Sequence, residues 1–124
     1  MMRSVFGFKT RNPDRDRQTD ATRFQRVQEM LSGISQEMER EKEGLEKRYG
    51  AVSADAAFLF EALENEGDRE RDSGRIAQLT STLQSCERRI AALKKQMLFM
   101  EDCRRTVARF AQNNDITLVS ATAE

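Results

Sequence analysis

The stretch that decides the fold runs from residue 76 to residue 111 and reads IAQLTSTLQSCERRIAALKKQMLFMEDCRRTVARFA. Apolar residues recur along it at alternating steps of three and four. This 3.5-residue period is typical of a helix that buries a narrow seam against another helix. The seam positions are Ile76, Leu79, Leu83, Cys86, Ile90, Leu93, Met97, Met100, Val107 and Ala111, with Arg104 as a polar interruption.

A second apolar stripe precedes this one and predicts another helix. Thr19 or Asp20 would cap its first turn. The phase of the stripe slips between Met38 and Leu45, where Glu41 or Lys42 occupies the seam, and such a stutter locally relaxes a supercoil. Gly50, with Ser53 after it, leaves open a break in this helix. The stripe comprises Phe24, Val27, Leu31, Ile34, Met38, Leu45, Tyr49, Val52, Ala56, Leu59 and Leu63.

The two helices carry opposite net charges. Residues 20–66 contain six basic and eleven acidic side chains, a net charge of −5, whereas residues 75–109 contain eight basic and three acidic, a net charge of +5. Residues 68–74 between them have no apolar side chain. Because flanking charges select the partner of a coiled-coil helix, the sequence predicts an all-α antiparallel helical hairpin, a two-stranded coiled coil.

The predicted boundaries follow from these patterns. Residues 1–18 are expected to form a flexible basic arm, and residues 114–124 a flexible tail whose β-prone Ile116–Val119 either frays or docks as a peptide. Between them, 19–113 form the hairpin. Its helices span about 20–65 and 75–113, and they are joined by a turn within 66–74 with Ser73 as the cap of the second helix.

A fold-back about residues 70–71 places position i opposite roughly 141 − i. In that register Arg104 lies close to Glu37 and Glu41, which predicts a register-fixing pair of Arg104 with one of these carboxylates. The alternative is that Arg104 extends along the helix to solvent.

Composition limits the class of protein. The chain has 124 residues, 34% of them charged, and a formal net charge of zero. Its longest apolar run, 56–60, is too short to span a bilayer, and its first residues lack the apolar core of a signal peptide. Cys86 and Cys103 are about 25 Å apart along one helix, so they cannot bridge each other there. We expect a reduced, cytoplasmic protein of one domain.

The sequence offers no catalytic, metal-binding or cofactor-binding constellation. Histidine is absent, and the glycines stand singly rather than in a phosphate-binding loop. Carboxylates at helical spacing, such as Glu37 with Glu41, are typical of a solvated acidic face. We therefore expect no enzyme activity and no small-molecule substrate.

Four apolar residues remain outside the seams: Phe58, Phe60, Leu98 and Phe99. They predict either a homodimer that forms a four-helix bundle or contact with another protein. Phe6 and Phe8 in the arm are further candidate contacts. The expected function is a non-enzymatic coiled-coil adaptor, scaffold or chaperone-like part of a larger assembly. A bias of 16 arginines to 5 lysines suggests a bacterial source. The alternative is nucleic-acid binding through the basic face of the second helix.

Overall fold

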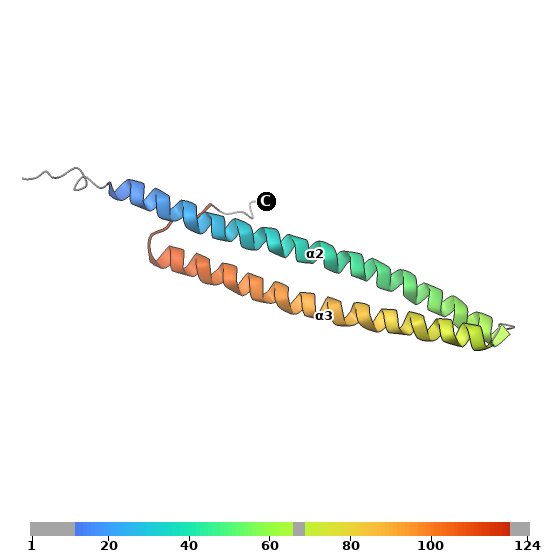
Figure 1. Ribbon diagram of the computed structural model, residues 1–124. Coiled ribbons are helices and arrows are strands. Elements are labelled where there is room, and N and C mark those ends of the chain that lie inside the picture. Colours follow the sequence, from blue (N-terminus) through green and yellow to red (C-terminus); the bar gives the residue numbers. More distant parts are fainter. Residues whose placement is uncertain (1–11, 66–68, 120–124) are drawn as a thin grey trace, which may run out of the picture. The chain divides into compact units, whose positions relative to one another are not determined.

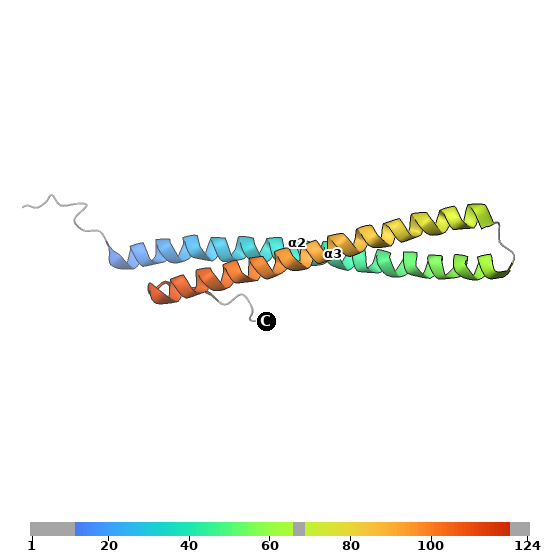
Figure 2. The same ribbon diagram turned by 90° about the horizontal axis from the view of Figure 1, so that it is seen from below.

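The computed structural model describes residues 12–65 and 69–119. These residues form two α-helices, α2 (Pro13–Asn65) and α3 (Arg69–Asn113), which pack against each other as an antiparallel hairpin (Figure 1, Figure 2). The predicted all-α hairpin is therefore confirmed. Within the described ranges, neither helix has a stretch both long and apolar enough to cross a bilayer.

The chain divides into two compact units, to which both helices contribute. The middle unit is Ser35–Phe99, and the terminal unit combines Met1–Ile34 with Met100–Glu124. Every contact between the helices described below lies within one unit or the other.

The first helix begins earlier than the sequence predicts. The backbone N–H of Asp14 donates to Asn12 Oδ1 at 2.9 Å, so Asn12 is the N-cap and Pro13 occupies the first helical position. Asp14 and Asp16 place negative charge in the first turn, which favours the helix dipole. The prediction that residues 13–18 belong to a flexible arm is wrong, because these capping signals outweigh the lack of apolar residues. Residues 1–11 lie outside the described part.

The second helix also begins earlier than predicted. It starts at Arg69, so Ser73 is inside the helix rather than at its cap, and residues 69–74 are helical rather than a turn. Glu70 and Asp72 in the first turn favour this start. Gly50 does not break α2, which continues through it to Asn65.

The seam of α3 agrees with the predicted stripe. All ten apolar positions named for it are buried or half-buried, and so is Arg104. The most buried are Leu79, Cys86, Leu93 and Ala111; Leu93 is the largest side chain that is fully enclosed. One heptad step before Leu79, Asp72 is also buried, with its carboxylate 3.9 Å from the Arg71 guanidinium.

The seam of α2 is continuous, so the predicted stutter is wrong. When polar residues are counted as seam positions, the seam positions follow one another at alternating spacings of three and four residues from Ala21 to Leu63. Gln28, Ser35 and Lys42, spaced by seven, are all half-buried, whereas Val27 lies at the edge and is 43% exposed. Loss of hydration at Lys42 disfavours its charged form, but ion pairs with Glu46 and Glu39 outweigh this and raise the pKa of Lys42.

The register follows from four contacts between the helices. Gln28 meets Arg104, Phe24 meets Phe110, Glu41 meets Arg89 and Tyr49 meets Glu87. The two residue numbers of each pair add up to between 130 and 136, rather than to the predicted 141. The difference arises because α3 begins at Arg69 and not after residue 74.

A left-handed turn ends α3 near the predicted residue. Asp115 has a φ of 59°, and the N–H of Ile116 donates to Ala111 O at 2.8 Å, which is the pattern of a Schellman motif. The N–H of Val119 then donates to Gln25 Oε1 at 3.0 Å. This hydrogen bond places Val119, in the described part of the tail, beside α2. Residues 120–124 lie outside the described part.

Candidate interaction surfaces

The four apolar residues that the sequence left outside the seams are exposed. Phe58 and Phe60 on α2 and Leu98 and Phe99 on α3 are between 57% and 71% exposed. Phe58 and Phe60 are two residues apart on a helix, so their side chains point in different directions, and so do those of Leu98 and Phe99. The four residues therefore belong to two surfaces rather than one.

These surfaces are the two flanks of the middle unit, each identified by one contact between the helices. The Tyr49 flank is the side on which Tyr49 bonds to Glu87, and the Arg89 flank is the side on which Arg89 bonds to Glu41. Heptad spacing places Phe60 and Leu98 on the Tyr49 flank, and Phe58 and Phe99 on the Arg89 flank.

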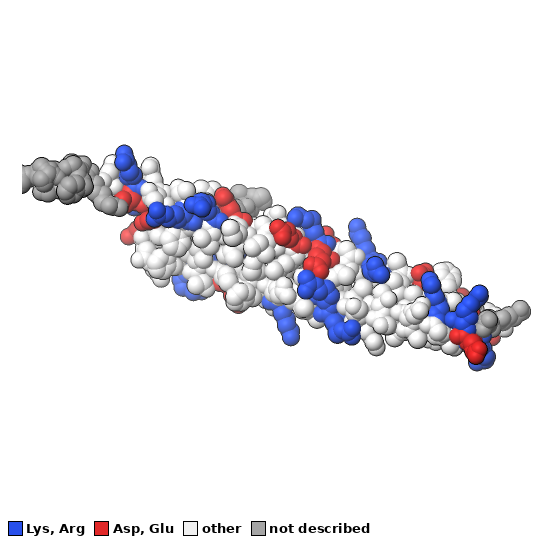
Figure 3. Space-filling model, in the orientation of Figure 1, with Lys and Arg blue, Asp and Glu red and all other residues white. Residues whose placement is uncertain are grey.

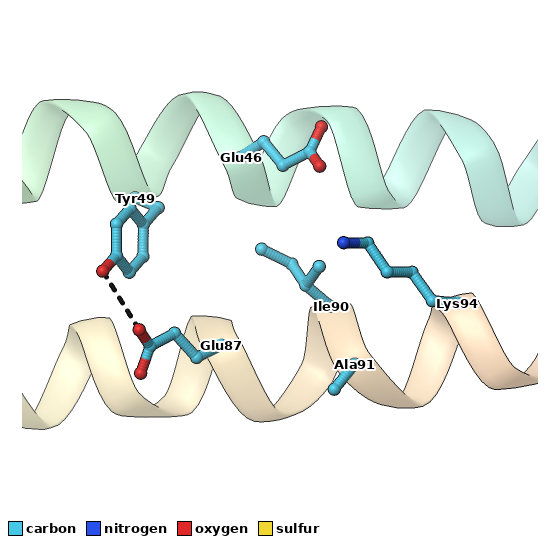
Figure 4. Close-up of a pocket in the computed structure, with 6 residues that line it drawn as sticks. All are labelled: Glu46, Tyr49, Glu87, Ile90, Ala91 and Lys94. Atoms are coloured by element: carbon cyan, nitrogen blue, oxygen red, sulfur yellow. Dashed lines mark hydrogen bonds between the residues drawn. The ribbon is translucent and has the colours of Figure 1, made fainter.

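The Tyr49 flank contains a groove of about 340 Å³. Figure 4 shows Tyr49 reaching from α2 toward Glu87, Glu46 lying along α2, and Ile90 and Lys94 pointing from α3 toward α2. The phenol of Tyr49 donates to Glu87 Oε2 at 3.0 Å. This bond and the charge of the carboxylate raise the pKa of Tyr49, because both favour the protonated phenol. The other residues that line the groove are acidic Glu46, basic Lys94 and apolar Ile90 and Ala91.

The Arg89 flank contains an ion pair between the helices and a second groove. Both carboxylate oxygens of Glu41 accept from Arg89, at 2.7 and 3.1 Å. These bonds hold the pKa of Glu41 below its ordinary value, although loss of hydration acts in the opposite direction. The groove has a volume of about 620 Å³ and is lined by Leu45, Arg48, Ser81, Thr82, Ser85, Cys86 and Arg89. Sequence reasoning missed it, since a groove results from small side chains that do not fill the space.

The residues expected to form the register pair have other partners. Glu41 binds Arg89, the Arg104 guanidinium binds Glu101 at 3.2 Å, and Glu37 is exposed. The observed register explains this, because it places Arg104 beside Gln28. The amide Nε2 of Gln28 donates to the backbone oxygen of Arg104 at 3.0 Å, which makes a polar layer in the seam of the terminal unit.

The terminal unit has apolar exposure that the sequence reasoning did not single out. Met30 is 67% exposed and Phe110 is 50% exposed, and the ring of Phe110 stacks on Phe24 with centroids 5.5 Å apart. Met30 and Phe110 are apolar residues outside the seam, and this is the sequence feature by which Phe58 was identified as a candidate contact. The candidate contacts Phe6 and Phe8 lie outside the described residues.

Some of the charged side chains pair with one another. In the face seen in Figure 3, basic and acidic groups lie next to each other in several places, and other basic groups stand apart. On α3, Arg105 binds Asp102 and Glu101. Across 12–65 and 69–119, no group of three or more acidic or cysteine side chains is placed to hold a metal ion.

Comparisons of this chain with protein-family models, with curated proteins and with solved structures find no match.

Proposed function

We propose that this chain is a non-enzymatic protein-interaction module, an adaptor, scaffold or chaperone-like component of a larger bacterial assembly in the cytoplasm. The observation that carries the proposal is the exposure of Phe58, Phe60, Leu98 and Phe99 on the flanks of the middle unit. Other side chains already fill the seam, so these four are not needed to hold the helices together. Large apolar side chains left in water support a contact with another protein surface.

The grooves support the same proposal. Each flank combines a groove with large apolar side chains, and a groove between two helices accepts the apolar side chains of a partner protein. The polar groups at the rims, Glu87 and Arg89, are engaged by Tyr49 and Glu41. They shape the surface rather than act as free acids or bases.

A co-purification experiment from the native cell tests the proposal. The variant in which Phe58, Phe60, Leu98 and Phe99 are all replaced by Ser is compared with a control in which exposed Ala51 and Ala57 become Ser. We expect a stoichiometric partner, or a second copy, to be retained by the control and lost by the fourfold variant. Equal retention by two variants with the same helical content, or turnover of any substrate by the chain, contradicts the proposal.

Nucleic-acid binding is the second candidate, and ion pairs at some of the basic residues of α3 weigh against it. Arg89, Arg104 and Arg105 on α3 each bind a carboxylate, so they are less available for phosphates. A mobility shift of RNA or DNA that persists at physiological salt would favour this candidate over the first.

A further inference from the structure

The Arg89 flank of the middle unit consists of residue pairs that face each other across the two antiparallel helices. Glu41 and Arg89 are one such pair, joined by hydrogen bonds of 2.7 and 3.1 Å. One heptad further along each helix, the same geometry sets Arg48 of α2 opposite Thr82 of α3. Both of these residues line the groove of about 620 Å³ on this flank. A cation thus faces a short hydroxyl side chain at the position where the neighbouring pair joins an acid to a base.

Arg48 has no carboxylate partner. Its guanidinium makes no ion pair or hydrogen bond with any residue of 12–65 or 69–119. Glu41 and Asp55 stand seven residues before and after Arg48 on α2, each about 10.5 Å away along the axis. The carboxylate of Glu41 is engaged by Arg89 instead. Arg48 is therefore a cation that this flank leaves unneutralised.

The groove beside Arg48 offers hydrogen-bond donors to an anion. The side chains of Ser81, Thr82 and Ser85 line it, and no residue in the described ranges hydrogen-bonds to their hydroxyls. Hydrogen bonds to an ionised acceptor are roughly twice as strong as those between neutral groups, so an oxyanion is favoured where such donors surround a cation. One guanidinium and three hydroxyls around one groove are a donor set of this kind.

The surroundings of the groove are also basic. Residues 81–95 of α3 contain four basic side chains and one acidic side chain, Glu87, which lies on the opposite flank. Arg88 borders the groove, one turn from Ser85, and Lys95 follows one heptad later. Within the part of the chain that the structure describes, neither Arg88 nor Lys95 makes an ion pair. Their charges attract an acidic partner to this side of α3.

We propose that the Arg89 flank docks an acidic segment of a partner protein, with one carboxylate of that segment bound by Arg48 and the hydroxyls of the groove. Phe58 and Phe99, exposed on the same flank, contact apolar side chains of the segment. A phosphodiester backbone fits less well, because its closely spaced charges would also meet Glu41 and Asp55 on either side of Arg48. The inference rests on the proposed function and gives the chemistry of its partner.

Fluorescence anisotropy of a labelled ten-residue polyglutamate peptide, titrated with the full chain at low salt, tests the site. Arg48→Gln is compared with Arg40→Gln, which removes the same charge from an exposed position of α2 that does not line the groove. We expect Arg48→Gln to weaken binding by about fivefold and Arg40→Gln by less than about twofold. Equal weakening by the two variants, or no binding of the peptide by the wild-type chain at millimolar concentration, overturns the proposal.

A carboxylate supplied by the chain itself gives a second test. Thr82→Glu places an acid opposite Arg48, as Glu41 stands opposite Arg89, and should compete with the peptide for the guanidinium. Gln84→Glu is the matched control, because it adds the same charge to an exposed position of α3 on the opposite flank. We expect Thr82→Glu to weaken binding of the peptide by about tenfold and Gln84→Glu by less than about threefold. If both weaken it equally, the groove is not the site.

A labelled oligothymidylate of ten nucleotides, used in the same titrations, separates a nucleic acid from an acidic protein. We expect it to bind more weakly than the peptide and to be little affected by Arg48→Gln. Tighter binding of the oligothymidylate that depends on Arg48 overturns the proposal. If the peptide results fail while a partner from the native cell still depends on the four exposed residues, the acidic docking falls and the proposed function stands. If that dependence also fails, both fall.

Discussion

Replacement of Leu93 by Ala is the sharpest test of the seam. Leu93 is 1% exposed and is the largest fully buried side chain of the described residues, whereas Leu98, five residues later on the same helix, is 69% exposed. Loss of a buried Leu side chain removes its transfer free energy and leaves a cavity. A hairpin of two helices can close part of that cavity, so we expect Leu93→Ala to cost about 2–3 kcal/mol, near the lower end of such substitutions.

The matched control is Leu98→Ala, which makes the same chemical change outside the seam. We expect it to change the free energy of unfolding by less than about 0.5 kcal/mol. Urea unfolding followed by far-UV circular dichroism measures both variants, with the m-value as the check that the cooperative unit is unchanged. In thermal unfolding the Leu93 variant should melt about 10–20 °C lower than the wild type. If Leu98→Ala costs as much as Leu93→Ala, our assignment of the seam is wrong.

Three further predictions concern single features of the helices. The chain has one Tyr and no Trp, so tyrosinate absorbance reports Tyr49 alone; we expect its pKa to lie above the ordinary value and to fall in Glu87→Gln. Gly50→Ala should raise the free energy of unfolding by about 1 kcal/mol, because Ala is the better helix former and its Cβ would meet nothing within 4 Å; an unchanged urea midpoint would contradict this. The pKa of Glu41 is lowered in the folded chain, so the stabilisation from its ion pair is present above the ordinary Glu pKa of about 4.3 and is lost as the pH falls through the lowered pKa. Arg89→Gln should therefore flatten the pH dependence of stability below about pH 5, as measured by urea unfolding across that range.

The sequence was sufficient for the architecture because two physical signals agreed. The apolar residues of α3 recur with the heptad period, and the helices carry opposite net charges, which favours antiparallel pairing. The structure confirms both the hairpin and the α3 seam. These signals are distributed over tens of residues, so errors at single positions do not affect them.

The seam of α2 was harder to predict because polar residues share it. The apolar residues alone omit Gln28, Ser35 and Lys42, and their phase shifts between Met38 and Leu45. In the structure the apolar residues on both sides fix the phase, and the polar ones follow it into the seam. These three side chains are half-buried because the neighbouring apolar residues pack in the seam, and not because the three side chains are themselves apolar.

The start of α3 was misplaced for a related reason. Residues 69–74 have no apolar side chain, a pattern that predicts a turn. Helix formation requires no apolar residue, however, and acidic side chains in the first turn favour it. The error displaced the predicted register by several residues, and with it the predicted partner of Arg104.

The candidate surfaces were predictable in part. Exposure of Phe58 and Phe99 follows from their places outside the seam. The groove beside Ser85 depends on how much volume several small side chains leave empty, which no periodicity in the sequence reports.

The ion pair of Glu41 and Arg89 has a consequence for how the hairpin finds a single alignment. Sliding one helix by a heptad would keep most leucines and isoleucines in contact, so apolar contacts alone distinguish poorly between such alignments. The slide would, however, bring Arg89 opposite Ile34 or Arg48 instead of Glu41, which breaks the ion pair and its two hydrogen bonds. Opposite charges at one pair of positions thus favour the native alignment over its neighbours.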